Sequence, residues 1–363
     1  MASQLSDVAN ARDACQPARV SKRKSTIDDV AEAAGVARVT VSRVLNNVQN
    51  VRPETRDRVL RAVQSLGYSV NHQARALASG MARQIMLIHA HSPELEPNSY
   101  YNSGLELGAL RACSSLGFDL VTRAVDPDDP NRARSLTAIL ERDRPTGLIV
   151  SPPLSDDMAF IDVAKRAGVR IVAVSAGEEA SAFVASVGID ERAAGYALGE
   201  HLASLGHRGI GFVKGPPRHR AAALRYQGFV DAVRAAGNGA EPWSATGDFT
   251  FKSGVEAAEA LLAARTGVTA LACANDDMAA GAMLALHRAG LDIPAQMSVT
   301  GFDDTPMSEI VWPPLTTIRQ PIKELSERAV HLLLEHLPGE GPRRDALPFE
   351  LIVRDSTAAP AVA

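Results

Sequence analysis

The sequence predicts a small all-α head followed by a larger α/β body, and three observations carry this prediction. Residues 26–66 hold three short stretches with apolar residues at helical spacing, separated by glycine and proline. From about residue 84, apolar strands alternate with amphipathic helices, which implies parallel, doubly wound sheets with helices on both faces. The body of roughly 280 residues exceeds the usual size of a single core, so two lobes are expected.

The bulk composition is that of an ordinary globular protein, with 46% hydrophobic and 22% charged residues. The three cysteines, Cys15, Cys113 and Cys273, show no metal-binding spacing. The N-terminus has no apolar leader, and no apolar run approaches the ~18 residues of a membrane span. These features predict a cytoplasmic protein without a metal or a cofactor.

Charge is distributed unevenly along the chain. The net charge is −4, yet residues 19–83 hold twelve Lys and Arg against five Asp and Glu. A basic head on an acidic body indicates a polyanionic partner for the head. A solvated charged surface explains the same charge equally well.

The head is expected to contain three helices after a disordered tail over residues 1–24. Thr26 is a suitable N-cap for the first helix, Asp29 completes a partial capping box, and Gly35 suits a left-handed turn. The second helix is expected over about 38–46, and the third from Pro53 to residue 66. The predicted inward residues of the first two helices are Val30, Ala33, Ala34, Val41, Val44 and Leu45.

The stretch from residue 26 to residue 46 resembles the helix-turn-helix of the lac repressor family. In such a motif the second helix lies in the major groove. Its exposed side here offers Arg38, Val39, Thr40, Ser42 and Arg43. Arginine can pair bidentately with guanine, while Thr40, Ser42 and Asn46 suit phosphate or base contacts. A plain helical hairpin with solvated arginines is the alternative interpretation.

The resemblance assigns roles to individual positions of the head. It implies that Arg38, Val39 and Arg43 read bases, and that Thr26, Thr40, Asn46 and Thr55 contact phosphates. The sequence departs from the family pattern at Ala37 and Arg52, where the family usually has Ser. A missing cap costs about 1 kcal/mol.

Residues 67–80 resemble the hinge helix of the same family, and residues 71–83 form the expected hinge and linker. There, a pair of short helices packs in the minor groove with a leucine wedged between base pairs. That leucine corresponds to Leu77, with Ala74 at a close backbone approach and Arg75 near phosphates. The remaining DNA-binding positions expected in this segment are Tyr68, Asn71 and Ala78. A plain linker is the alternative.

The body is predicted to consist of eight strands and eight helices. The strands are expected at 85–90, 120–124, 147–151, 170–175, 184–189, 209–214, 270–274 and 298–302. The helices are expected at 102–116, 131–143, 156–167, 191–205, 220–236, 251–265, 276–289 and 323–337.

The body also resembles the lac repressor family, which implies a periplasmic-binding-protein-like fold of two lobes joined by three crossing segments. The stretches that carry this resemblance are 187–190, 205–208, 274–276, 301–304 and 314–320. The implied lobes cover about 84–187 with 319–348, and about 188–318 with 349–358.

Family effectors are mostly sugars, and sometimes nucleobases or other metabolites. Planar polar side chains that can bridge sugar hydroxyls stand at matching positions, with Phe249 as the stacking ring. The expected effector-binding residues are Tyr100, Tyr101, Ser151, Arg225, Phe249, Asn275, Asp303 and Gln320. Open α/β sheets bind ligands beyond the carboxyl ends of their strands, where these residues fall.

Other interpretations of these residues stay open. Asn275 and Asp303 also suit helix caps, Arg225 a surface ion pair, and Phe249 the core. Ser175 stands where the family often has an acidic ligand residue. The proline-containing stretches 151–157, 214–217 and 312–314 resemble a branch of the family that senses glucosides.

The sequence therefore predicts a homodimeric transcriptional regulator, a repressor that binds a palindromic operator under control of a small effector, a sugar or glucoside. A sugar-binding transport protein without DNA regulation is the alternative. An enzyme is not expected, because the stretch 209–215 lies within a strand and so fails as a nucleotide loop. His89 and His91 likewise lack a third metal ligand.

Overall fold

The computed structural model describes residues 26–45, 51–66, 83–91, 99–237, 241–335 and 341–361. The chain divides into two compact units, with the boundary between Arg75 and Ala76. We call them the head and the body and describe each by itself. The predicted tail and the hinge-helix positions lie outside the described residues.

The head contains α1 (Ile27–Ala34), α2 (Arg38–Leu45) and α3 (Pro53–Ser65). Thr26 caps α1 as predicted: its Oγ1 accepts from the Asp29 amide at 3.3 Å, and the Asp29 carboxylate accepts from the Thr26 amide at 2.7 Å. Gly35 ends α1 in the left-handed conformation, at φ 60°. Pro53 opens α3, and Arg52 before it makes no side-chain cap.

The core of the head differs from the prediction in α1, and the burial of Leu45 lies outside what the structure describes. The buried residues of this core are Val30, Ala31, Ala34, Val41, Val44, Val59 and Ala62. The prediction that Ala33 faces inward is wrong, because Ala33 is exposed and Ala31 is buried instead. The buried stripe of α1 follows positions 27, 30, 31 and 34, and this spacing leaves Ala33 on the opposite face.

The first sheet of the body has six parallel strands in the order β11-β5-β4-β3-β1-β2. Its strands are β1 (Gln84–Ala90), β2 (Asp119–Val125), β3 (Gly147–Val150), β4 (Arg170–Val174), β5 (Ala185–Gly188) and β11 (Arg344–Ala346). Its covering helices are α5 (Ser99–Leu116), α6 (Arg132–Asp143), α7 (Met158–Arg166), α8 (Glu178–Ser181) and α14 (Ile322–Glu335), with a 3₁₀ turn at Leu154–Asp156.

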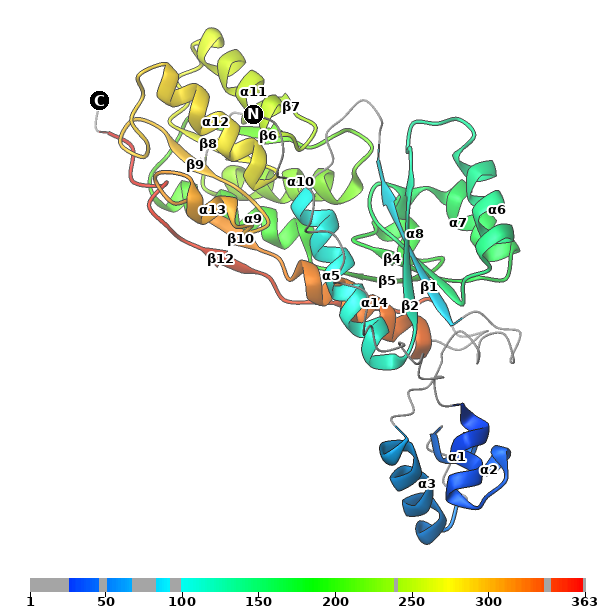
Figure 1. Cartoon of the computed structure of the whole chain (residues 1–363). Coiled ribbons are helices and arrows are strands. Elements are labelled where there is room, and N and C mark those ends of the chain that lie inside the picture. The colour runs from blue at the N-terminus through cyan, green and yellow to red at the C-terminus, as the bar shows by residue number, and fades with distance from the viewer. Residues whose placement is uncertain are drawn as a thin grey trace, which may run out of the picture. The chain divides into compact units, whose positions relative to one another are not determined.

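Side-chain alternation along β1 explains how this sheet is covered. Ile85 and Leu87 pack under α5 and α14, whereas Met86 and Ile88 pack under α6 and α7. All four are fully buried, as expected for a parallel strand with helices on both faces. Figure 1 shows α5 beside α14 on one side of the sheet and α6 beside α7 on the other.

The second sheet has four parallel strands in the order β7-β6-β8-β9. Its strands are β6 (Ile210–Lys214), β7 (Trp243–Thr246), β8 (Ala270–Cys273) and β9 (Ser298–Thr300). Its helices are α9 (Glu191–Ser204), α10 (Arg220–Ala235), α11 (Phe251–Ala264), α12 (Asp276–Arg288) and α13 (Met307–Ile310), with the first four arranged as two pairs around the sheet (Figure 1). We call each sheet with its helices a lobe.

The sequence analysis missed seven short elements and misplaced several helix ends by one to three residues. The missed elements are β7, β10 (Thr317–Arg319), β11, β12 (Glu350–Ile352), α8, α13 and the 3₁₀ turn. The helix expected at 156–167 begins only at Met158, because Asp157 caps it by accepting from two backbone amides. Elements of three or four residues are too short to show a period in the sequence.

Three described segments carry the chain between the two lobes. They are the links from β5 to α9, from β10 to α14, and from β11 to β12. The strands β10 and β12 pair with each other in antiparallel register, with Arg319 opposite Glu350.

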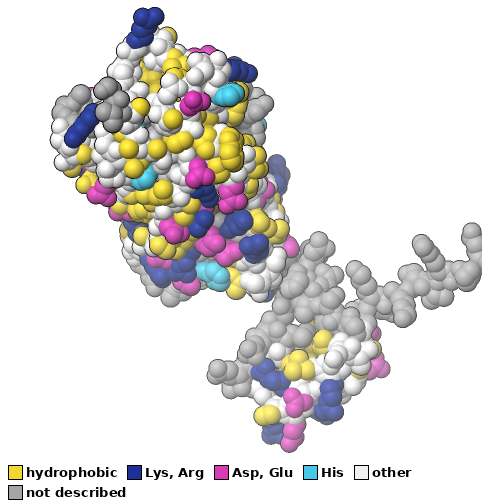
Figure 2. All heavy atoms as spheres, turned by 90° about the vertical axis from the view of Figure 1, so that its left-hand side faces the viewer, with side chains coloured by type: hydrophobic (Ala, Val, Ile, Leu, Met, Phe, Trp, Pro, Cys, Tyr) yellow, Lys and Arg dark blue, Asp and Glu magenta, His cyan; other side chains and the backbone are white. Residues whose placement is uncertain are grey.

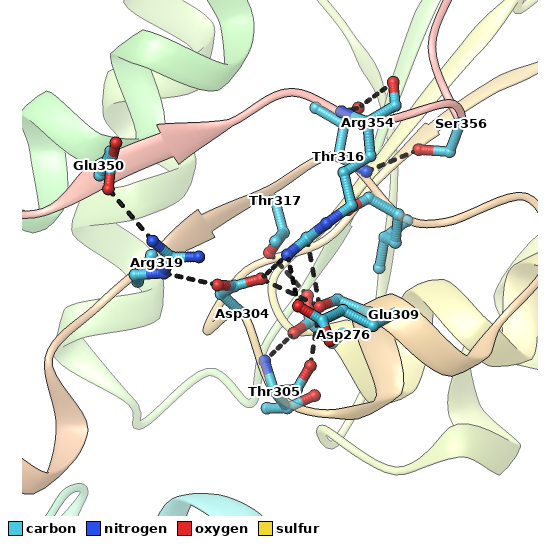
Figure 3. A network of polar contacts seen from close by, with 12 residues as sticks. Asp276, Asp304, Thr305, Glu309, Thr316, Thr317, Arg319, Glu350, Arg354 and Ser356 are labelled. Atoms are coloured by element: carbon cyan, nitrogen blue, oxygen red, sulfur yellow. Dashed lines mark hydrogen bonds and ion pairs between the residues drawn. The ribbon is translucent and has the colours of Figure 1, made fainter.

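A polar network anchors these crossing strands to the second lobe (Figure 3). The Asp304 carboxylate accepts from Arg354 at 2.7 Å and from Arg319 at 2.6 Å. The Asp276 carboxylate accepts from the Thr305 amide and the Thr317 hydroxyl, both at 2.7 Å. Two buried carboxylates therefore hold the start of the crossing segments in place.

The body surface mixes charges of both signs. On the face drawn in Figure 2, Lys and Arg side chains lie among Asp and Glu side chains. No helix in the described part of the chain combines the length and apolarity needed to cross a membrane.

Helices α9 and α10 approach each other closely through glycine. A Cβ added at Gly195 would lie 1.9 Å from the carbonyl oxygen of Arg225, and one at Gly228 would lie 1.8 Å from that of Arg192. Backbone atoms cannot yield as a flexible side chain can. The two helices therefore pack at a distance that only glycine allows.

We predict that Gly195→Ala destabilises the body by about 1–3 kcal/mol, because the added methyl group overpacks this helix contact. Urea unfolding monitored by circular dichroism measures the change. Glu200→Ala on the exposed side of α9 is the control and should shift stability by less than about 0.5 kcal/mol. Equal stability of Gly195→Ala and wild type would show that the contact can relax.

Candidate functional site

The second helix of the head presents the predicted base-reading residues on its surface. Val39 is 59% exposed, an unusual state for valine, and Arg43 is also exposed. Arg38 lies 3.7 Å from Asp28, with both side chains largely exposed. Such an exposed pair contributes little stability, so Arg38 can exchange this partner for another.

A cavity of 380 Å³ lies between the two lobes of the body. Its walls come from residues that follow parallel strands at their carboxyl ends. The described lining residues are Ala90, His91, Tyr101, Asn102, Pro127, Asp128, Pro152, Pro153, Ser175, Glu191, Pro216, Pro217, Arg218, His219, Ala221, Arg225, Asp248, Phe249, Asp303 and Gln320. We call this cavity the cleft.

A buried ion pair forms part of the cleft wall. Arg225 on α10 donates from Nη2 and Nε to the Glu191 carboxylate at 2.9 and 3.2 Å, and from Nη1 to the Ala274 carbonyl. The guanidinium carbon lies 3.2 Å from the ring centre of Phe302. Only 4% of the Arg225 side chain and 5% of the Glu191 side chain are exposed, so each charge depends on the other.

Asp303 and Gln320 form a second polar pair in the cleft. The Gln320 amide donates to the Asp303 carboxylate. Burial raises the pKa of Asp303 to about 7, although Arg225 and the Gln320 hydrogen bond oppose this shift. Asp303 therefore gains and loses its proton near neutral pH.

An aromatic ring and a histidine also line the cleft, next to each other. The ring centres of His219 and Phe249 lie 4.9 Å apart in an edge-to-face arrangement. His219 caps α10, because its Nδ1 accepts from the Ala222 amide at 3.3 Å. Burial lowers the pKa of His219 to about 3, so the ring is neutral and its Nε2 carries the proton.

Comparisons with known proteins agree with this architecture. The chain matches the family description "Bacterial regulatory proteins, lacI family" over residues 26–71 and "Periplasmic binding protein-like domain" over residues 200–357. The HTH-type transcriptional repressor PurR of Klebsiella pneumoniae (strain 342) is 31% identical over 314 residues, which cover 86% of this chain and 90% of the relative. The chain belongs to the lac repressor family.

Two solved structures extend the likeness to the whole fold. A complex of the transcriptional regulator CelR with cellobiose matches with a TM-score of 0.68 at 30% identity, covering 92% of this chain and 100% of that one. A lac repressor dimer bound to operator and the anti-inducer ONPF matches with a TM-score of 0.74 at 31% identity, covering 93% and 100%. The protein is thus a DNA-binding transcriptional regulator, and these three relatives are regulators rather than enzymes or transport proteins.

The structure brings five of the eight expected effector-binding residues of this lac repressor family member together in the cleft. They are Tyr101, Arg225, Phe249, Asp303 and Gln320. Arg225 forms a buried ion pair rather than the surface pair considered as its alternative. Phe249 has a positive φ of 68° in the loop before α11.

The other three expected residues lie outside the cleft lining. Asn275 caps α12 by accepting from the Met278 amide, and its own amide donates to the Phe249 carbonyl at 2.9 Å. It therefore positions the loop that carries Phe249. Ser151 is buried at the end of β3. Tyr100 lines a second cavity of 530 Å³, which shares Asp303 and Gln320 with the cleft.

For the DNA-binding positions, the structure describes only the head. The Thr26 hydroxyl is engaged within α1, donating to Asp29 at 2.8 Å. Thr40, Ser42 and Thr55 are half-buried. The positions outside the described residues are Asn46, Tyr68, Asn71, Ala74, Arg75, Leu77 and Ala78.

The sequence analysis missed several residues of the cleft, including Glu191, His219 and Asp248. The signal that could have found them is their position directly after a strand or at the first turn of the following helix. His219 and Asp248 follow β6 and β7, and Glu191 follows β5. Among the described residues, no group of His, Cys, Asp and Glu is arranged to hold a metal ion.

We predict that Asp303→Asn stabilises the protein at pH 8 and that this gain shrinks towards pH 4. The unfolded carboxyl ionises near pH 4, whereas the folded one holds its proton until about pH 7. Ionising it above pH 7 therefore costs folding free energy, by at most about 4 kcal/mol. Asn cannot ionise, keeps an acceptor for Gln320 and resembles Asp in its tolerance of a positive φ, which is 109° here.

Urea unfolding of both proteins at pH 4.5, 6, 7 and 8 measures this difference. A stability difference that does not change with pH would contradict the raised pKa of Asp303. Asp292→Asn, in the turn after α12, is the matched control for loss of a carboxylate away from the cleft.

Proposed function

We propose that this regulator is a cytoplasmic repressor that binds a palindromic operator as a homodimer and responds to a sugar or glucoside. The residues that line the cleft are the main support for a sugar as the effector. It sets planar polar groups of Arg225, Asp303 and Gln320 in the same cavity as the Phe249 ring. Planar donors and acceptors suit neighbouring sugar hydroxyls, and an aromatic ring suits the apolar face of a sugar.

The relatives support the same assignment. CelR was solved with cellobiose, and the lac repressor was solved as a dimer on operator DNA. A dimer with twofold symmetry reads a site with matching symmetry. On this proposal Arg38, Val39 and Arg43 read bases, while Leu77 wedges into the minor groove.

Control by the effector follows from the position of the cleft between the lobes. Tyr101 and Asn102 line it from the first lobe, and His219 and Phe249 from the second. A ligand that contacts both lobes favours one arrangement of them over others. If DNA favours a different arrangement, each ligand weakens the other by the same factor.

A gel-shift titration with the promoter region of the protein's own gene tests the proposal. We expect sequence-selective binding that changes by about fivefold or more when the matching sugar is present. Cellobiose, maltose, sucrose and trehalose serve as probes. Selective DNA binding that no sugar changes would contradict the sugar as effector but not the binding of an operator. The absence of selective DNA binding would contradict the binding of an operator.

We predict that Arg43→Ala costs about 1–3 kcal/mol of operator binding and relaxes selectivity at one base pair. Arg43→Lys is the matched control for charge: it retains the cation but loses the bidentate pairing with guanine. A selection from randomised operators with each variant measures both effects. If both variants select the wild-type sequence, Arg43 makes no base contact.

A further inference from the structure

The charges of the described cleft lining are unbalanced in favour of acids. The carboxylates are Asp128, Glu191, Asp248 and Asp303, and the guanidinium groups are Arg218 and Arg225. Burial and the nearby Arg225 lower the pKa of His219, so its ring adds no positive charge. Among the described lining residues, the permanent positive charges that an anionic ligand could meet are those of the two arginines.

Both arginines are already paired. Arg218 lies 2.8 Å from Asp128, and these side chains are 71% and 66% exposed. Arg225 lies 2.9 Å from Glu191 with almost no exposure of either side chain. Water and salt screen the first pair strongly, but not the second. Glu191 therefore neutralises the guanidinium group of Arg225 in the buried part of the cleft.

The amino end of α10 is also occupied. A helix N-terminus attracts anions through its free backbone amides. Here the His219 ring nitrogen accepts from the Ala222 amide at 3.3 Å, so that amide is not free to bind an anion. This terminus therefore has fewer free backbone amides for an anion than an uncapped helix would have.

Uncharged hydroxyl groups, in contrast, have partners available in the cleft. Arg225 has five N–H donors, and its hydrogen bonds to Glu191 and to the Ala274 carbonyl use three of them. The buried Gln320 Oε1 accepts no hydrogen bond from any described residue. A ligand hydroxyl group can accept a hydrogen bond from the remaining N–H groups of Arg225 and donate one to the Gln320 Oε1.

We propose that Glu191 makes the cleft selective for uncharged hydroxylated ligands, because it neutralises Arg225 and so excludes phosphorylated and carboxylated sugars. This inference rests on the proposed function, since it concerns the same effector site. It goes further by naming the ligand's charge and the residue that decides it.

Thermal unfolding of the full-length wild-type protein at pH 7.5, without DNA, tests the ligand class. Cellobiose and maltose are each compared with their aldonic acids, and trehalose with trehalose 6-phosphate, all at constant ionic strength. A neutral sugar at a hundred times its Kd should raise Tm by about 5 °C, and its anionic counterpart should leave Tm unchanged. An anionic counterpart that raises Tm as much as its parent overturns the proposal.

Glu191→Gln tests the cause with inorganic phosphate as the probe. The amide keeps the shape of the side chain but frees the charge of Arg225. We expect phosphate to bind this variant on the order of tenfold more tightly than wild type, measured as Tm against phosphate concentration. Asp231→Asn is the matched control, because it frees Arg192 in an exposed pair between the same two helices. It should leave phosphate binding unchanged.

Equal phosphate responses of wild type and Glu191→Gln overturn the role of Glu191, whether or not any sugar binds. If Glu191→Gln fails to fold, Glu191→Asp keeps the charge on a shorter side chain and separates the pair. A gain in phosphate binding by Glu191→Asp supports the proposal, and the lack of a gain opposes it. Because these experiments contain no DNA, they remain distinct from the promoter test.

Discussion

The buried ion pair between Glu191 and Arg225 is the constraint on which the rest of the cleft depends. Each charge would be costly to bury alone, so the two side chains must meet with good geometry. Their helices meet because Gly195 and Gly228 let the backbones approach closely. The Phe302 ring and the Ala274 carbonyl then fix the orientation of the guanidinium group. The packing of α9 on α10, the position of the Phe302 ring and the carbonyl after β8 thus all help to stabilise the buried charges of this pair.

The pair also sets the ionisation of its neighbours. The positive charge of Arg225 adds to burial in lowering the pKa of His219, and it opposes burial at Asp303. The histidine is therefore fixed as a neutral donor, while Asp303 stays close to its titration point. A site built this way presents directed hydrogen-bonding groups without an unpaired positive charge among its described lining arginines, which suits discrimination by shape and hydroxyl pattern.

The sequence predicts most of this fold because the long strands and helices show their period locally. The run from residue 85 to residue 88 is buried on both faces, and its continuous apolar character indicates a parallel strand without any knowledge of its partners. The hydrogen-bond partners of individual polar side chains, in contrast, come from residues that are distant in the sequence. Asn275 caps α12 and supports a carbonyl 26 residues away, and Glu191 meets a partner 34 residues away. The short strands β10 and β12 likewise form by pairing with each other across a long stretch of sequence.

The cleft and the crossing segments are joined through neighbouring residues. Asp303 and Gln320 face the cleft, whereas Asp304 and Arg319, one residue away in each segment, belong to the polar network of the crossing strands. The Asp303 amide also donates to the Ile318 carbonyl at 2.8 Å. A ligand that forms hydrogen bonds with Asp303 and Gln320 therefore acts on the same backbone that holds the crossing strands. Because those strands connect the lobes, ligand contacts in the cleft are coupled through them to the arrangement of the two lobes.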